Sequence, residues 1–365
     1  MLKRLIFITL ITSFQLAKAQ EETRSYYVDK DLAPRERFVD FSDLKLDVEF
    51  EPKKKVVRGK VTEKFTVLRK AIDTLFLDAI DMTFYEVKLN GEPIEYVKYK
   101  NGITLKFGKT LKWNERHEIF IKYEATPKKG LYFVGWNDET NRSRKQIWTQ
   151  GQGIDNRHWI PMYDERNDQL VSEMIVHFDS SYQVLSNGEL LSKKKASNKM
   201  PQGMNTWHYE ISHRHAPYLI MLGIGNYGIV SDTSLSGVPL KFYYYPEEKG
   251  HFEPTYRYSK KMFQWFEDEI GVAYPWKSYS QIPVQDFMYG AMENTTATIF
   301  GDFYLIDSRG FLDRNYLRVN AHELAHQWFG DMITARSGAH HWLQESFATH
   351  YDLLYQKEAF GDDHY

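Results

Sequence analysis

Two histidines, His322 and His326, have the residue type and the spacing to do chemistry together. Residues four apart on a helix lie on the same side, about one turn from each other. Both imidazoles can therefore bind one metal ion, with the helix fixing their separation. Glu323 follows the first histidine and lies beside this shared face. From there it can accept a proton from a metal-bound water instead of binding the metal itself.

A third metal ligand is available in Glu345, which follows His326 after a gap long enough for a second helix to begin. Two imidazole nitrogens and one carboxylate oxygen, with a fourth position open to water, form the donor set of a catalytic zinc site. A lone carboxylate in the first turn of a helix is more often a capping charge, but the upstream histidines favour a ligand. We predict one Zn²⁺ per chain, held by His322, His326 and Glu345. His341, four residues before Glu345, is expected at the surface or beside the ligand rather than on the metal.

Two helices must position these ligands. Apolar residues surround the histidine motif, and they are Tyr316, Leu317, Val319, Ala321, Leu324, Ala325, Trp328 and Phe329. This pattern predicts a helix that is buried on most sides and stops at Gly330. A chance His-Glu-x-x-His is the alternative in a chain with 13 histidines, but such polar side chains in a buried helix are costly without a partner. Residues 342–360 carry apolar side chains at helical spacing and end at Gly361, which predicts the second helix.

Further motifs precede the histidine pair in a fixed order. They are Trp148-Thr149-Gln150-Gly151-Gln152, Pro161-Met162-Tyr163-Asp164-Glu165, Ala273-Tyr274-Pro275-Trp276 and Gly290-Ala291-Met292-Glu293-Asn294. Together with His-Glu-x-x-His and the later glutamate, this order resembles the M1 family of zinc aminopeptidases, also called gluzincins. The resemblance runs from roughly Phe41 to Tyr365.

The resemblance implies roles for residues 289–293. Glu293 would bind the α-ammonium group of a peptide with a free N-terminus, a task that suits a carboxylate. Gly290 and Ala291 would offer backbone groups to an extended substrate, which small residues allow to approach closely. Tyr289 would line the pocket for the first side chain. Read alone, this motif indicates only a loop.

Gln152 stands where many members of that family carry glutamate and some carry glutamine. The resemblance implies contact with the substrate amine, through a neutral acceptor instead of a charge. An ordinary polar loop residue between two glycines is the alternative, and the sequence leaves it open. Asp164 and Glu165 are expected to be structural, with no catalytic role. Arg166 stands where relatives usually carry proline.

The predicted function is a zinc-dependent aminopeptidase that hydrolyses the N-terminal peptide bond by metal-activated water. A zinc endopeptidase on the same scaffold is one alternative, although a buried carboxylate at Glu293 would repel a capped chain. A non-catalytic peptide-binding scaffold is the other. The presence of all three metal ligands and of Glu323 argues against it.

Composition predicts an exported protein. Lys3 and Arg4 precede a short apolar stretch over residues 5–16 and a small-x-small site over residues 17–19, so residues 1–19 read as a signal peptide. No second apolar run of spanning length follows, so no membrane span is expected in the mature chain. The protein should be periplasmic or secreted. A formal net charge of −2 gives no electrostatic case for nucleic acid, and the absence of cysteine excludes disulfides.

The predicted fold class is multidomain α+β. Alternating apolar residues and Asn-Gly turns indicate an N-terminal antiparallel β domain over residues 20–232. The resemblance implies that residues 233–365 are the first part of a thermolysin-like zinc peptidase domain. The family's oxyanion-binding tyrosine and helical carboxy-terminal region lie far beyond the zinc glutamate. We therefore expect this chain to be truncated and nearly inactive by itself, with apolar surface exposed around Trp342, Phe347 and Leu354.

Overall fold

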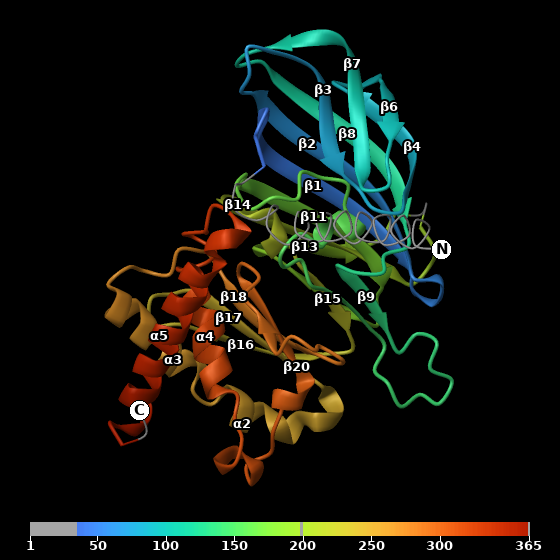
Figure 1. The fold of residues 1–365 in the computed structure, drawn as a ribbon. Coiled ribbons are helices and arrows are strands. Elements are labelled where there is room, and N and C mark those ends of the chain that lie inside the picture. Colours follow the sequence, from blue (N-terminus) through green and yellow to red (C-terminus); the bar gives the residue numbers. More distant parts are fainter. Residues whose placement is uncertain (1–34, 198–199, 364–365) are drawn as a thin grey trace, which may run out of the picture.

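The computed structural model describes residues 35–197 and 200–363. Within these ranges the strands form four sheets. In Figure 1 the sheets of the N-terminal half, coloured blue to green, lie beside the strands and helices of the later residues, coloured yellow to red. The predicted signal peptide, residues 1–19, lies outside the described residues. Among the described residues, no helix has the length and apolar character needed to cross a membrane.

Three sheets make up the N-terminal part. The largest has the order β13 (Glu189–Lys195), β14 (Met204–His215), β11 (Leu170–Asp179), β1 (Val39–Glu51), β2 (Val56–Val67), β8 (Arg116–Ala125), β4 (Met82–Leu89) and β5 (Glu92–Pro93). The second has the order β12 (Gln183–Ser186), β15 (Leu222–Gly225), β10 (Gln146–Thr149) and β9 (Leu131–Val134). The third joins β3 (Ala71–Asp78), β7 (Gly102–Lys112) and β6 (Glu95–Lys98).

The N-terminal sheets are antiparallel with one exception. In the described residues β1 pairs in parallel with β11, whereas the other pairings of these sheets are antiparallel. The prediction of a purely antiparallel domain is therefore corrected at this one pair. A parallel neighbour needs a long crossover, and here the chain passes through the other two sheets between Glu51 and Leu170.

Alternation along the strands places the core. On β1, Leu44, Leu46 and Val48 are buried, while the side chains between them are half-buried or exposed. Successive side chains of a strand point to opposite faces of the sheet, so this period of two gives one apolar face. These residues belong to a large apolar cluster that unites the three N-terminal sheets.

The fourth sheet is mixed and carries the later motifs. Its order is β16 (Gly228–Thr233), β17 (Pro239–Tyr244), β18 (Tyr279–Val284), β20 (Ala297–Gly301) and β19 (Ala291–Met292). The predicted domain boundary at residue 232 falls inside the β16–β17 hairpin. That boundary remains a prediction, although β16 pairs with this sheet and with no N-terminal strand of the described residues.

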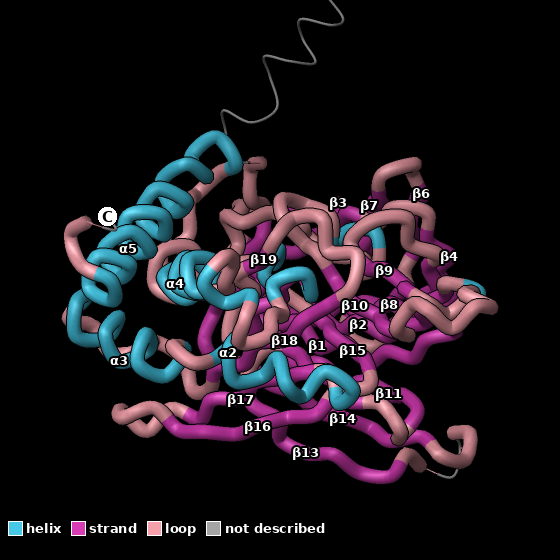
Figure 2. The backbone as a smooth tube through the Cα atoms, turned by 90° about the horizontal axis from the view of Figure 1, so that it is seen from below, coloured by secondary structure: helices cyan, strands magenta, loops and turns pink. Residues whose placement is uncertain are grey.

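Helices gather at one side of this sheet, as Figure 2 shows for α3, α4 and α5. They are α2 (Phe252–Tyr256), α3 (Ser259–Ile270), α4 (Leu317–His326) and α5 (His341–Phe360). Short 3₁₀ turns occur at Pro52–Lys54, Asn156–His158, Pro217–Leu219, Pro246–His251, Asp302–Tyr304, Gly310–Leu312 and Gly338–His340. A second apolar cluster fills the space between the helices and the sheet. The sheets of the N-terminal part, followed by a sheet with helices at one side, agree with the predicted multidomain α+β class.

Candidate metal centre and peptide-binding edge

The two helices that carry the predicted ligands pack against each other. Helix α4 contacts both α3 and α5. Its apolar residues Ala321, Leu324 and Ala325 are fully buried, which accounts for the apolar surroundings of the motif. The helix ends at His326 rather than at Gly330, which corrects the predicted end. The chain tightens early because the N–H groups of residues 327 and 328 bond to carbonyls only three residues back.

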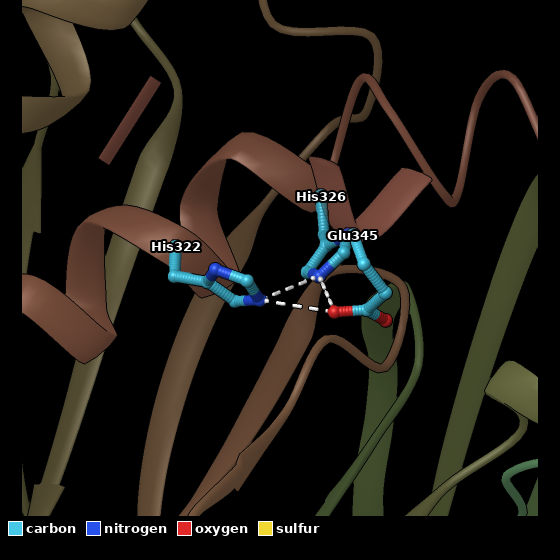
Figure 3. A group of neighbouring side chains, drawn as sticks. All are labelled: His322, His326 and Glu345. Atoms are coloured by element: carbon cyan, nitrogen blue, oxygen red, sulfur yellow. Dashed lines mark hydrogen bonds and ion pairs between the residues drawn. The ribbon is translucent and has the colours of Figure 1, made fainter. Parts of the chain in front are cut away.

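The side chains of His322, His326 and Glu345 converge on one point between α4 and α5 (Figure 3). The Nε2 atoms of the two histidines are 3.0 Å apart. Glu345 Oε2 lies 3.4 Å from Nε2 of His322 and 3.6 Å from Nε2 of His326. In the described residues, His322, His326 and Glu345 form a group that could hold a metal ion, since their potential ligand atoms all lie within 4.8 Å of one another. The structure thus brings together the three predicted ligands.

Hydrogen bonding prepares His326 to bind a cation. Its Nδ1 lies 2.9 Å from the carbonyl oxygen of Phe329. A carbonyl only accepts, so Nδ1 carries a proton and Nε2 is the nitrogen that would bind a metal ion. The Phe329 carbonyl comes three residues after His326. The chain must therefore turn just after the helix for this carbonyl to reach the His326 ring, which explains part of the early helix end.

The electrostatics of the cluster call for a positive charge. Burial lowers the pKa of His326, but the carboxylates of Glu293, Glu345 and Glu323 outweigh burial and raise it to about 10. For Glu345, burial raises the pKa, but hydrogen bonds from the histidines outweigh burial and hold the pKa well below its usual range. A divalent cation would neutralise the same carboxylates without a proton. Two imidazoles and one carboxylate match the ligands that zinc prefers, so the residues present fit that ion.

Glu323 lies beside the ligands and does not join them. It is 6% exposed, and its Oε2 has no hydrogen-bond partner in the described residues. Burial raises the pKa of Glu323 well above its usual value, the charge of His326 opposes this, and the carboxylates of Glu293 and Glu345 add to it. A carboxylate with a raised pKa and a free oxygen is suited to accept a proton.

Glu293 is buried close enough to this cluster for its charge to act on His326. It is 3% exposed, and its Oε1 accepts hydrogen bonds from the Tyr218 hydroxyl at 3.3 Å and from Nε2 of Gln344 at 3.4 Å. The Nε2 of Gln327, just after α4, donates to the Glu293 carbonyl at 3.1 Å. Both helices of the metal cluster are therefore tied to Glu293 by side-chain amides.

The residues before Glu293 form a sheet edge. Ala291 pairs with Phe300, and β19 is the last strand of its sheet, so its outer edge meets no other strand of the described residues. Gly290 has a φ of +89°, a left-handed conformation that favours glycine. Its carbonyl accepts from Gly301 N at 2.7 Å. An unpaired strand edge can bind an extended peptide through its backbone.

Comparison with known proteins decides the family. The peptidase M1 N-terminal domain matches residues 38–219, and the peptidase family M1 domain matches residues 255–365. The chain belongs to peptidase family M1.

Three curated relatives carry aminopeptidase names. Leucyl aminopeptidase of Saccharolobus solfataricus is 27% identical over 288 residues, covering 76% of this chain and 34% of the relative. Probable aminopeptidase 1 of Sulfurisphaera tokodaii is 29% identical, covering 78% and 35%. Aminopeptidase N of Streptomyces lividans is 27% identical, covering 88% and 37%. The chain thus spans about a third of the length of these M1 relatives.

The resemblance to the M1 family also singled out Tyr289 and Gln152. Among the described residues, Gln152 is linked to the metal cluster only through His341, which contacts Glu345. Tyr289 is 57% exposed, with its ring 5.6 Å from that of Phe287. Its predicted role in the first side-chain pocket remains a prediction. Gln152 reaches α5, where its Nε2 lies 2.9 Å from Nε2 of His341. Gln152 thus contacts α5 through His341, and its contact with a substrate amine remains a prediction.

Asp164 contributes to a buried ion network in this M1 chain. Its Oδ2 accepts from the backbone N–H of Arg157 at 2.9 Å, and its own N–H donates to Asp78 at 3.1 Å. Arg157 also pairs with Asp78 at 3.1 Å. The network joins β3 to the loop before β11, which agrees with the structural part expected for Asp164.

Sequence reasoning missed the residues around the ligands. Tyr218, Gln344 and Arg166 all lie within the network of the M1 site, yet no spacing rule points to them. The signals available were the position of Gln344 next to Glu345 and that of Arg166 directly after Asp164 and Glu165. His341, expected at the surface or beside the ligand, bonds to Glu345 Oε1 at 2.9 Å.

Proposed function

We propose that this chain carries the zinc-binding and amine-binding residues of an aminopeptidase that removes N-terminal residues from peptides. The observation that supports this most is the convergence of His322, His326 and Glu345 beside the buried carboxylate of Glu293. One Zn²⁺ would be held by the two Nε2 atoms and by Glu345 Oε2. The aminopeptidase names of the M1 relatives agree with this proposal.

The chemistry divides between the ion and the protein. Zinc, when bound, lowers the pKa of water toward about 7 and polarises a substrate carbonyl. Glu323 accepts the proton of the attacking water on its free Oε2 and passes it to the departing amine. Because burial and neighbouring carboxylates raise the pKa of Glu323, the proton is held firmly enough to be carried between the two steps.

Glu293 would select the free N-terminus. Its carboxylate is fixed by Tyr218 and Gln344, both neutral donors, so its negative charge is left for an ammonium group. A peptide extended along the outer edge of β19 would bring its first residue toward Glu293 and its first peptide bond toward the metal ligands. An acyl-capped peptide would leave this buried carboxylate without a cation, which argues against the endopeptidase alternative.

Metal content and paired substrates test the proposal. We expect about one zinc per chain by atomic absorption, lost on chelation, as the three ligands predict. In the protein that carries this chain, we expect hydrolysis of an alanine anilide and little hydrolysis of its acetylated counterpart. Equal cleavage of both would favour an endopeptidase. Zinc binding without cleavage of either would favour a peptide-binding scaffold.

We also propose that the protein is exported, to the periplasm or the medium. The support is the basic start, apolar stretch and small-x-small site of residues 1–19. Mass spectrometry of the protein isolated from its host tests this. We expect a mature chain that begins at Gln20. A protein that still carries residues 1–19 would contradict export by this route.

A further inference from the structure

His341, the first residue of α5, lies at the centre of a network that no motif predicts. Its Nε2 is 2.9 Å from Glu345 Oε1 and 2.9 Å from the Gln152 side-chain amide. Its Nδ1 is 3.1 Å from Nη1 of Arg166. One imidazole therefore joins a predicted metal ligand to two residues of the N-terminal part of the chain.

The donors and acceptors of this network fix the tautomer of the ring. The guanidinium of Arg166 only donates, so Nδ1 of His341 must accept. The ring proton then lies on Nε2, where it can be donated to the carboxylate of Glu345. That one proton is also near the Gln152 side chain, so Gln152 can share it only through its amide oxygen, which has nearly the same shape as the amide nitrogen.

Arg166 is itself held in place. It is 8% exposed, and its guanidinium packs 4.8 Å from the centre of the Tyr218 ring. Its Nη1 is the guanidinium nitrogen that contacts His341. The Tyr218 hydroxyl contacts Glu293, so the same support reaches both the metal-binding and the amine-binding carboxylates.

We propose that His341 is a positioning residue for the metal-binding carboxylate of Glu345, with its ring oriented by Arg166 and Gln152. The inference rests on the proposed zinc site. His341 engages Oε1, so Oε2 is left facing the two histidine nitrogens, as a single-oxygen ligand requires. The ring is outside the group whose ligand atoms all lie within 4.8 Å of one another, so it supports the ligand instead of adding a fourth one.

Zinc affinity tests the proposal, measured by competition with a chromogenic chelator on the purified protein. His341→Leu should weaken zinc binding about 10- to 100-fold, the range known for partners of metal ligands. His341→Gln keeps an N–H that can reach Glu345, so it should recover most of the loss. The matched control is His350→Leu on the same helix, an exposed position that should leave affinity unchanged.

A second variant and a spectrum separate positioning from folding. Arg166→Met keeps His341 but frees its tautomer, and it should weaken zinc binding about tenfold. The visible spectrum of the Co²⁺-substituted protein should change for His341→Leu and Arg166→Met and stay the same for His350→Leu. Unchanged affinity in His341→Leu and Arg166→Met would overturn the positioning role. Failure of the unsubstituted protein to bind zinc would instead contradict the proposed function.

Discussion

At the scale of single residues, Glu323 separates proton transfer from metal binding. It lies next to a ligand in sequence yet outside the ligand group, with one buried oxygen free. Glu323→Gln keeps the shape of the side chain and removes its ability to take a proton. We expect zinc content to stay near that of the unsubstituted protein while turnover falls about a hundredfold or more. Atomic absorption and anilide hydrolysis check both halves, with His322→Ala as the comparison that should lose the metal.

Glu293 acts on binding rather than on the chemical step. Its carboxylate is buried and receives hydrogen bonds only from neutral groups among the described residues. Glu293→Gln should raise KM for substrates with a free amine about 10- to 100-fold, because a hydrogen bond to a charged group contributes about 1.5–3 kcal/mol. Steady-state kinetics on free and acetylated anilides measure the effect. If discrimination between the two substrates stayed the same, Glu293 would not be the amine-binding group.

At the scale of elements, the contact between α4 and α5 sets the distance between the metal ligands. Ala348 is fully buried one turn after Glu345, on the face of α5 that packs in the second apolar cluster. Ala348→Leu forces extra volume into that contact and should cost about 1–3 kcal/mol of unfolding free energy.

The displaced helix should also bind zinc more weakly, because Glu345 moves with it. Thermal unfolding and the chelator competition measure the two effects. Ser346→Leu adds the same side chain at an exposed position of α5 and serves as the control. Equal zinc affinity in both variants would show that the helix contact does not set the ligand geometry.

At the scale of the whole molecule, a buried histidine links stability to pH. His215 ends β14, is fully buried, and has its Nε2 2.9 Å from the Ser172 hydroxyl on β11. Burial lowers its pKa from 6.5 to about 3. The unfolded chain therefore binds a proton below pH 6.5 that the folded chain refuses until about pH 3, so stability is lost as pH falls through this window.

The expected loss from His215 is about 2 kcal/mol between pH 7 and pH 5, at about 1.4 kcal/mol per pH unit below 6.5. Denaturant unfolding at a series of pH values measures it. His215→Gln should flatten the slope in this range. His213→Gln, at an exposed position two residues earlier, should leave the slope as it is. A steep slope that persists in His215→Gln would assign the acid sensitivity to other groups.

Exposed apolar residues on α5 are a second feature at this scale. Trp342 is 61% and Phe347 42% exposed, as expected from the sequence, while Leu354 is half-buried. The comparisons align about a third of the M1 relatives, so these relatives extend beyond the region matched by this chain.

The sequence by itself determined the parts of the site that local geometry dictates. A helix places residues four apart on one side, so His322 and His326 had to meet if that helix formed. Alternation predicted the β-rich half, and the motif order predicted the family. The details it missed, such as the parallel β1–β11 pair and the helix end at His326, depend on long crossovers and on a side chain bonding back to its own chain.

Only the tertiary structure decided what surrounds the ligands. Gln152 and Arg166 reach His341 across 189 and 175 residues of sequence, and no periodicity links positions that far apart. Their meeting depends on how the N-terminal sheets pack beside α5. The direction of the hydrogen bonds then decides what the contact does. The Arg166 guanidinium only donates, so the proton of the His341 ring lies on Nε2, which faces Glu345.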